Sequence, residues 1–127
     1  MSVVYLDTHV AVWLHDGLLE KLTKSATDAI EESPLLISPM VYLEFDYLFK
    51  RGRIRHPAAT VYANLHTGFA VTICQQSFAA VAAAAVEFDW TNDPFDRIIV
   101  AQSQLHPKSH LISADETIRT NYPRSLW

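Results

Sequence analysis

Carboxylate side chains occur in this sequence where strands and helices are expected to begin or end. Some directly follow short apolar runs and others lie early in helices; they are Asp7, Glu44, Asp93, Asp96 and Asp115. In an open parallel sheet, binding sites form beyond the carboxyl ends of the strands. Acids that lie far apart in the sequence are therefore expected to meet at one end of one sheet.

Such a cluster has a defined chemistry. Neighbouring carboxylates raise each other's pKa, and a divalent cation relieves their repulsion. Hard oxygen ligands without a partner cysteine or paired histidine favour Mg²⁺ or Mn²⁺ over Zn²⁺. A bound ion of this kind can activate a water molecule and stabilise a phosphoryl oxyanion, and two ions together would do both.

Four of the acids also have a purely structural interpretation. Asp93 precedes a proline, which makes it a very good helix N-cap, and Asp96 resembles the acid of a capping box. Asp7 could cap the first helix, and Asp115 could be a turn residue. Taken one at a time, these residues leave the structural and the chemical interpretations open.

Glu44 is harder to explain as a structural residue. Its neighbours are nearly all apolar: Met40, Val41, Tyr42, Leu43, Phe45, Tyr47 and Leu48. A helix with so little polar surface is expected to be largely buried, and a carboxylate on it then needs a partner, either an arginine or a metal ion.

Short apolar runs alternate with helical segments along the chain. Strands are expected at 3–6, 35–37, 69–73 and 110–113, with an edge strand at 125–127. Helices are expected after the cap Thr8, over 23–33, from Pro39 to Lys50-Arg51-Gly52, after Pro57, after Ser77, from Pro94 through Leu105, and near Asp115. This alternation predicts a three-layer α/β/α domain with a central parallel sheet.

Composition narrows the class of protein. The chain has 127 residues, 50% of them apolar, and a formal charge of −4, which fits one globular domain over residues 1–127 and argues against a basic field over the whole molecule. No apolar run approaches the roughly 20 residues of a membrane helix, and no signal peptide is recognisable. Cys74 is the single cysteine, which suits a reducing, cytoplasmic location.

The acids lie in segments that resemble known motifs. These segments are Leu6-Asp7-Thr8, Glu44 after Ser38-Pro39, Asp93-Pro94-Phe95-Asp96-Arg97-Ile98-Ile99-Val100-Ala101-Gln102, and Ile112-Ser113-Ala114-Asp115. In this order the chain resembles PIN-domain ribonucleases, and among them the VapC toxins of toxin–antitoxin pairs. The resemblance spans essentially the whole chain, and the segment from Asp93 to Gln102 is its most specific part.

The resemblance implies roles for individual residues. The catalytic acids, which would also hold Mg²⁺ or Mn²⁺, are Asp7, Glu44, Asp96 and Asp115. Asp93 becomes a helix cap and supporting group, while the hydroxyls of Thr8 and Ser113 orient the cluster. Ser113 stands where the family more often has threonine. The implied reaction is hydrolysis of an RNA phosphodiester, leaving 5′-phosphate and 3′-hydroxyl ends.

The same resemblance implies a cognate antitoxin and a homodimer as partners. The antitoxin would lie against early helices, although core packing is the default interpretation of the apolar segment 10–19. For RNA, the candidate contacts are Lys50, Arg51, Arg53 and Arg97. The run from Lys50 to Arg53 could equally be a solvated helix end, and the six histidines are expected on the surface or in loops.

Three other functions can be compared with this sequence. A response-regulator receiver needs an acid pair at the first strand and an aspartate ending the third, whereas the third predicted strand ends at Ile73-Cys74-Gln75. A non-catalytic interaction module of the same fold would tolerate the loss of its acids, and this chain retains them. A PIN nuclease of RNA processing, outside any toxin–antitoxin pair, is the main enzymatic alternative.

Overall fold

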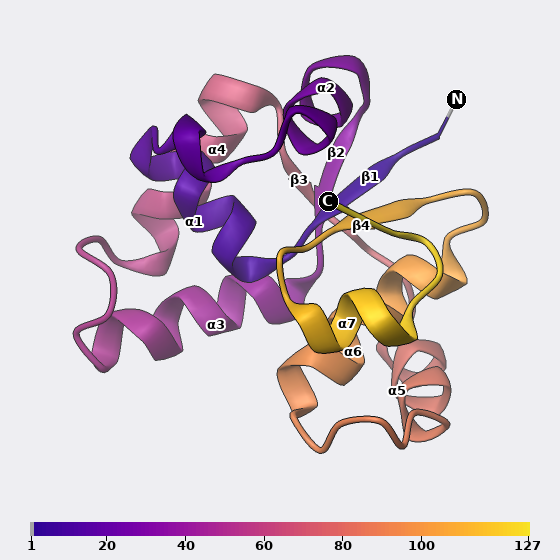
Figure 1. Cartoon of the computed structure of the whole chain (residues 1–127). Helices are drawn as coiled ribbons and strands as arrows, with labels where there is room; N and C mark the ends of the chain where they lie inside the picture. Colours follow the sequence, from indigo (N-terminus) through magenta and orange to yellow (C-terminus); the bar gives the residue numbers. More distant parts are fainter. Residues whose placement is uncertain (1) are drawn as a thin grey trace.

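The computed structural model describes residues 2–127, and its five strands form a single sheet (Figure 1). The strands are β1 (Val4–Leu6), β2 (Leu35–Ile37), β3 (Thr72–Ile73), β4 (His110–Ile112) and β5 (Ser125–Leu126). Their order is β3-β2-β1-β4-β5, and every neighbouring pair is parallel. The carboxyl ends of all the strands therefore lie at the same edge of the sheet, as the sequence predicted.

Helices cover both faces of the sheet. They are α1 (Thr8–Asp16), α2 (Lys24–Glu32), α3 (Pro39–Lys50), α4 (Ala58–Phe69), α5 (Phe78–Val86), α6 (Pro94–Leu105) and α7 (Glu116–Asn121), with a 3₁₀ turn at Leu19–Lys21. Figure 1 shows α1, α2 and α4 grouped on one side of the strands and α5, α6 and α7 on the other. This arrangement confirms the predicted three-layer α/β/α fold. None of these helices is long and apolar enough to cross a bilayer within residues 2–127.

The core is centred on the two middle strands. Tyr5 and Leu6 of β1 and Leu111 and Ile112 of β4 are completely buried. Such strands read as continuous apolar runs because layers on both faces remove every side chain from water. Since β1 and β4 are fixed from both faces, the residues that follow them, including Asp7, start from a well-fixed backbone.

The third strand is shorter than predicted. Residues 69–73 read as one strand, but α4 continues through Phe69, and Ala70 ends it with a left-handed backbone (φ 57°). The Ala70 N–H donates to the carbonyl of His66 at 3.0 Å, so this residue belongs to the helix end. Only Thr72 and Ile73 pair with β2. A short apolar run does not by itself distinguish a last helical turn from a strand.

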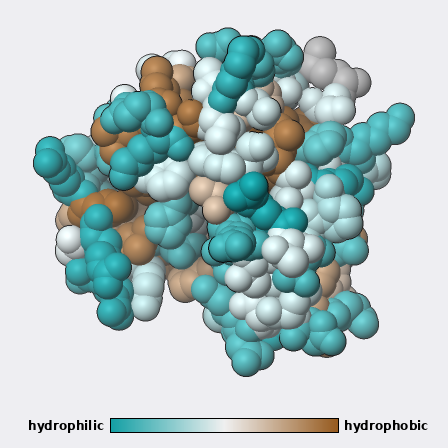
Figure 2. Space-filling model, viewed as in Figure 1, coloured by the Kyte–Doolittle hydropathy of each residue, from teal (hydrophilic) through white to brown (hydrophobic). Residues whose placement is uncertain are grey.

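Two further expectations need correction. Of the two candidate caps of the first helix, Asp7 is confirmed as the N-cap, whereas Thr8 is the first helical residue. Helix α3 was expected to be largely buried, yet Leu43 is 53% exposed and Tyr47 44%. Only one side of α3 packs on the core, so the apolar composition of this helix overestimated how much of it is buried. Figure 2 shows separate apolar patches among polar side chains on the face in view.

Candidate active site

Asp7 is held by hydrogen bonds to both of its carboxylate oxygens. Its Oδ1 accepts from the Thr8 backbone N–H at 2.8 Å, and its Oδ2 accepts from the Ser113 hydroxyl at 2.7 Å. Burial raises the pKa of the Asp7 carboxyl, while these two hydrogen bonds lower it in part. The Ser113 hydroxyl also accepts from the Asp115 N–H at 3.0 Å, so one serine connects the ends of β1 and β4.

Glu44 points from the middle of α3 toward the start of α1. Its Oε1 accepts a hydrogen bond from the Thr8 hydroxyl. Burial raises the pKa of Glu44, the Thr8 hydroxyl lowers it, and the charge of Asp7 raises it again. The sequence predicts that this carboxylate needs a partner, and the structure provides the Thr8 hydroxyl rather than an arginine.

Asp96 lies at the electrostatic centre of the acidic group. Its pKa is raised to about 8, first by burial and then by the negative charges of Asp93, Asp7, Asp115 and Glu44. These four acids lie near enough to Asp96 for their charges to act on its pKa, because solvent screens distant pairs. The structure thus brings together five acids that are spread over more than a hundred positions of the sequence.

Asp93 and Asp115 also act as helix caps. The Asp93 carboxylate accepts from the N–H of Phe95 at 2.8 Å and of Asp96 at 3.4 Å. The Asp115 carboxylate accepts from the Ile118 N–H at 2.9 Å. Both residues are exposed, so their outer oxygens stay open to solvent. The capping interpretation and membership of the acidic group therefore hold together for both.

A buried hydrogen bond fastens two of the acid-bearing helices to each other. Ser38, the N-cap of α3, donates from its hydroxyl to the side-chain carbonyl of Gln102 on α6. Ser38 and Gln102 are 1% and 2% exposed. Since α3 carries Glu44 and α6 carries Asp96, this bond fixes the relative position of those carboxylates. Gln102 thereby gains a physical role in the motif that ends with it.

His9 lies beside the acidic group, whereas the sequence predicts it only as a histidine on the surface or in a loop. It is exposed on the first turn of α1, and its positive form lowers the pKa of both Asp7 and Glu44. With Trp13, Lys21 and Arg53 it lines a cleft of about 290 Å³ that lies along α1. The sequence signal that could have predicted this is the position of His9, two residues after Asp7 in the first turn of a helix that begins at that acid.

The basic residues differ in how free they are to contact RNA. Lys50 pairs with Asp46 at 3.0 Å, and Arg51 donates to the Tyr47 hydroxyl at 3.2 Å. Arg53 lines the cleft beside His9. These contacts are exposed and weak, so all three side chains can turn toward a phosphate.

Arg97 is directed elsewhere. Its guanidinium donates to the backbone carbonyls of Ala85 at 3.2 Å and Val86 at 3.4 Å, at the C-terminal end of α5. A cation is favoured at that helix end. In this arrangement Arg97 fastens α6 to α5, and a direct contact between Arg97 and RNA stays a prediction.

The donor set of the acidic group fits a hard divalent cation. Every candidate ligand is a carboxylate or hydroxyl oxygen, and negative charge is concentrated around Asp96, which a cation would relieve. Within residues 2–127, no three His, Cys, Asp or Glu side chains are placed so that they could hold one ion together. The acids are thus close enough to repel one another without forming a closed metal cage.

The chain is thus an all-parallel α/β/α domain with acids gathered near the carboxyl ends of its strands. The profile of the PIN domain matches residues 4–122, and the chain belongs to the PIN domain family. The crystal structure of VapBC2 from Rickettsia felis, bound to a DNA fragment from its promoter, contains a chain of similar fold: TM-score 0.62, 12% identity, 93% of this chain and 92% of that chain covered. None of the curated proteins matches this chain significantly.

Proposed function

We propose that this protein is a metal-dependent endoribonuclease toxin of the VapC kind, a single PIN domain that works in the cytoplasm and is inhibited by a cognate antitoxin. The observation that carries the proposal is the raised pKa of Asp96, to about 8, which burial causes first and the negative charges of four other acids raise further. Structural caps alone do not require such repulsion, whereas a site built for cations does.

Each acid has a part in this proposal. Asp7, Glu44, Asp96 and Asp115 would hold the ion or ions, and Asp93 would support Asp96 from the preceding cap. When bound, Mg²⁺ or Mn²⁺ supplies Lewis-acid activation of water and of the phosphoryl oxygen. Mg²⁺ usually keeps several waters, so one or two direct carboxylate ligands suffice.

The hydroxyl residues position the acids. Thr8 donates to Glu44 through its side chain and to Asp7 through its backbone, and Ser113 donates to the other oxygen of Asp7. Each carboxylate thereby keeps a fixed orientation before any ligand arrives. Burial and the neighbouring negative charges raise the pKa of Asp96 to about 8, and a bound cation would favour the charged form of this carboxyl.

RNA would reach the acids along the cleft beside α1. Arg53 and His9 line this cleft, and Lys50 and Arg51 lie at the nearby end of α3. Positive groups at this place would offset the repulsion between the acidic site and the RNA backbone. The formal charge of −4 makes this local arrangement necessary.

The partner proteins are proposed on two grounds. One is the fold shared with a chain of the Rickettsia felis VapBC2 complex. The other is the apolar surface left open on α3, where Leu43, Tyr47 and Phe49 are exposed. Exposed apolar side chains of this size are common at protein–protein interfaces. We therefore propose an antitoxin and a second copy of the chain as partners.

The test is cleavage of a mixed cellular RNA pool by antitoxin-free protein with Mg²⁺ or Mn²⁺. Asp96→Asn and EDTA should each abolish discrete cuts, whereas the control Asp28→Asn, at an acid on α2 whose side chain is 44% exposed, should leave them intact. The products should carry 5′-phosphate and 3′-hydroxyl ends. Products with 2′,3′-cyclic phosphate, or cutting that survives Asp96→Asn, would contradict the proposal.

The same assay addresses the alternatives. Folded protein that binds RNA but never cuts it would indicate a non-catalytic interaction module. Cutting by a protein that no antitoxin inhibits would indicate a PIN nuclease of RNA processing. The neighbouring gene distinguishes a toxin from a nuclease of RNA processing, since a toxin of this kind is expected to be encoded next to a small antitoxin.

A further inference from the structure

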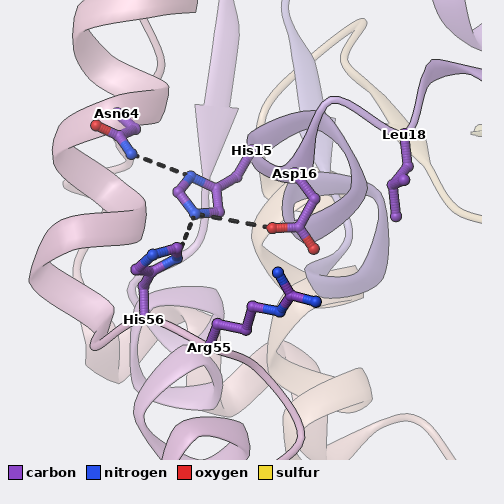
Figure 3. A pocket seen from close by; sticks show the side chains of 6 residues that line it. All are labelled: His15, Asp16, Leu18, Arg55, His56 and Asn64. Atoms are coloured by element: carbon purple, nitrogen blue, oxygen red, sulfur yellow. Dashed lines mark hydrogen bonds and ion pairs between the residues drawn. The ribbon is translucent and has the colours of Figure 1, made fainter.

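Two histidines face each other at the far end of α1, away from the acids. His15 Nε2 lies 3.3 Å from His56 Nδ1, and the two rings are nearly perpendicular (Figure 3). His15 belongs to the last turn of α1, and His56 belongs to the loop that leads into α4. The side chain of His15 is only 6% exposed, whereas His56 is exposed.

The pair opens into a cleft of about 450 Å³. Its walls are His15, Asp16, Leu18, Arg55, His56 and Asn64. Figure 3 shows these side chains coming from α1, from the loop before α4 and from α4 itself. Gly17, with a left-handed backbone (φ 73°), ends α1 here. The mostly buried imidazole of His15 therefore borders a solvent-open space that an ion or a small molecule can enter.

We propose that this cleft is a binding site for a borderline transition-metal ion of the Zn²⁺, Ni²⁺ and Cu²⁺ class, with His15 Nε2 and His56 Nδ1 as its two protein ligands. Bonds of about 2.0–2.1 Å to a tetrahedral ion place two nitrogens about 3.3–3.4 Å apart. The two nitrogens now share a hydrogen bond of 3.3 Å, so they are already at about that spacing, and an ion would replace the proton between them. Because His56 is exposed, its ring can tilt to turn Nδ1 toward an ion lying beside the nitrogen–nitrogen line.

The neighbours of His15 support it as a ligand. Asn64 Nδ2 lies 3.4 Å from His15 Nδ1 on the side away from His56. If the Asn64 amide turns over, its oxygen accepts the Nδ1–H, and that tautomer leaves Nε2 free to bind the ion. Metal-binding histidines commonly have such a partner on their second nitrogen.

Asp16 supplies charge near the ion. Its Oδ1 lies 3.8 Å from His15 Nε2, which is close for attraction but not a third ligand position, and within residues 2–127 no set of three such ligands forms. Water would complete the coordination, as the open cleft allows. Arg55 lines the same cleft, and its positive charge opposes a cation, so the expected affinity is moderate.

The proposed site is separate from the acidic one and does not depend on the proposed nuclease function. His15 is eight residues after Asp7 on the same helix, which places them roughly 12 Å apart along its axis. The acidic group offers hard oxygens, which suit Mg²⁺ and Mn²⁺, whereas the cleft offers imidazole nitrogens, which suit Zn²⁺, Ni²⁺ and Cu²⁺. An ion in the cleft would tie α1 to the loop before α4.

The test is Cu²⁺ and Ni²⁺ binding by the whole chain, with excess Mg²⁺ present to occupy the acidic group. Calorimetry should give one Ni²⁺ per chain, and the electron paramagnetic resonance spectrum of the Cu²⁺ form should show hyperfine coupling to imidazole nitrogens. His56→Gln should weaken Ni²⁺ binding at least tenfold and remove the coupling of one imidazole. The control His110→Gln, at the start of β4, should change neither.

His15→Gln should behave like His56→Gln, but His15 is buried, so the exposed His56 carries the decisive result. Ni²⁺ should also raise the melting temperature of the wild type by several degrees and that of His56→Gln by much less. Binding that is equal in wild type and His56→Gln, or a Cu²⁺ spectrum without nitrogen coupling, would overturn the proposal. So would inorganic phosphate that binds at His15 and His56 while Ni²⁺ does not, since that outcome indicates an anion site.

Discussion

The two ends of α1 are built from different chemistry. At its N-terminus, Asp7 is buried and both of its oxygens accept hydrogen bonds that fix the carboxylate. At its C-terminus, His15 is equally buried, but its partner His56 is an exposed loop residue at 3.3 Å. One end is set by strands and helix caps, and the other depends on an exposed residue of the loop before α4.

This difference explains which ligands each end would favour. The acidic end concentrates negative charge on hard oxygens around Asp96, which favours a hard cation that keeps its waters. The histidine end carries little net charge and two imidazole nitrogens, which favour borderline metals. A single nine-residue helix therefore separates two proposed sites that need not compete for the same ion.

The largest effect is expected from Asp7→Asn. Asparagine keeps the shape and the acceptor for the Thr8 N–H but removes the charge, so RNA cleavage should fall at least 100-fold while the melting temperature stays equal or rises. Nitrogen coupling of Cu²⁺ in the cleft should persist. Cleavage near the wild-type rate would break the assignment of the acidic end, and loss of the Cu²⁺ signal would show that the two ends are not separate.

The stability of the metal-free protein should depend on pH through Asp96. Its pKa is about 8 in the folded chain and near 3.8 when unfolded, so the folded state binds more protons between these values. The contribution of Asp96 to the free energy of unfolding is therefore fully present below about pH 4. It is lost as the pH rises to about 8, by at most about 1.4 kcal/mol per pH unit. Burial-raised pKa values of Asp7 and Glu44 act in the same direction.

Urea unfolding in EDTA at several pH values measures this slope. Asp96→Asn should flatten it, and Mg²⁺ should counteract the loss at high pH by binding the ionised acids. An equal slope in Asp96→Asn would show that other groups cause it.

Ser38→Ala tests the fastening of the acidic end. The substitution removes both the N-cap of α3, where the Ser38 hydroxyl accepts from the Met40 N–H at 3.0 Å, and the buried bond to Gln102. A loss of about 2 kcal/mol is expected in chemical unfolding, together with reduced cleavage. The matched control Ser77→Ala removes only the exposed cap of α5 and should cost about 1 kcal/mol or less. Equal costs would show that the Gln102 bond contributes nothing.

The smallest effect is expected from Arg53→Ala. One lost phosphate contact should weaken RNA binding a few-fold and reduce the slope of log affinity against log salt by about 0.7. Fluorescence anisotropy with the Asp7→Asn protein avoids cleavage during the measurement. Lys24→Ala, an exposed cation on α2 paired with Asp28, is the control and should leave the slope unchanged.

Local signals predicted most of the fold. The runs at β1, β2 and β4, the helix starts after Ser38 and Ser77, and the cap Asp93 all follow from rules that act within a few residues. The errors came where a local pattern had two outcomes. Residues 69–71 are apolar in a helix end as they would be in a strand, and α3 is apolar although much of it faces solvent.

The sequence alone determined the order of the acids, their places after strands and at helix starts, and the hard-oxygen chemistry that they share. Only the tertiary structure decided that the Thr8 hydroxyl partners Glu44, that Arg97 turns to α5, and that His15 meets His56. The physical reason is the sequence distance over which each interaction acts. Helix caps and hydrophobic periodicity depend only on residues a few positions apart. Contacts between residues 36 or 41 positions apart depend on how whole helices pack and on which way each side chain then points.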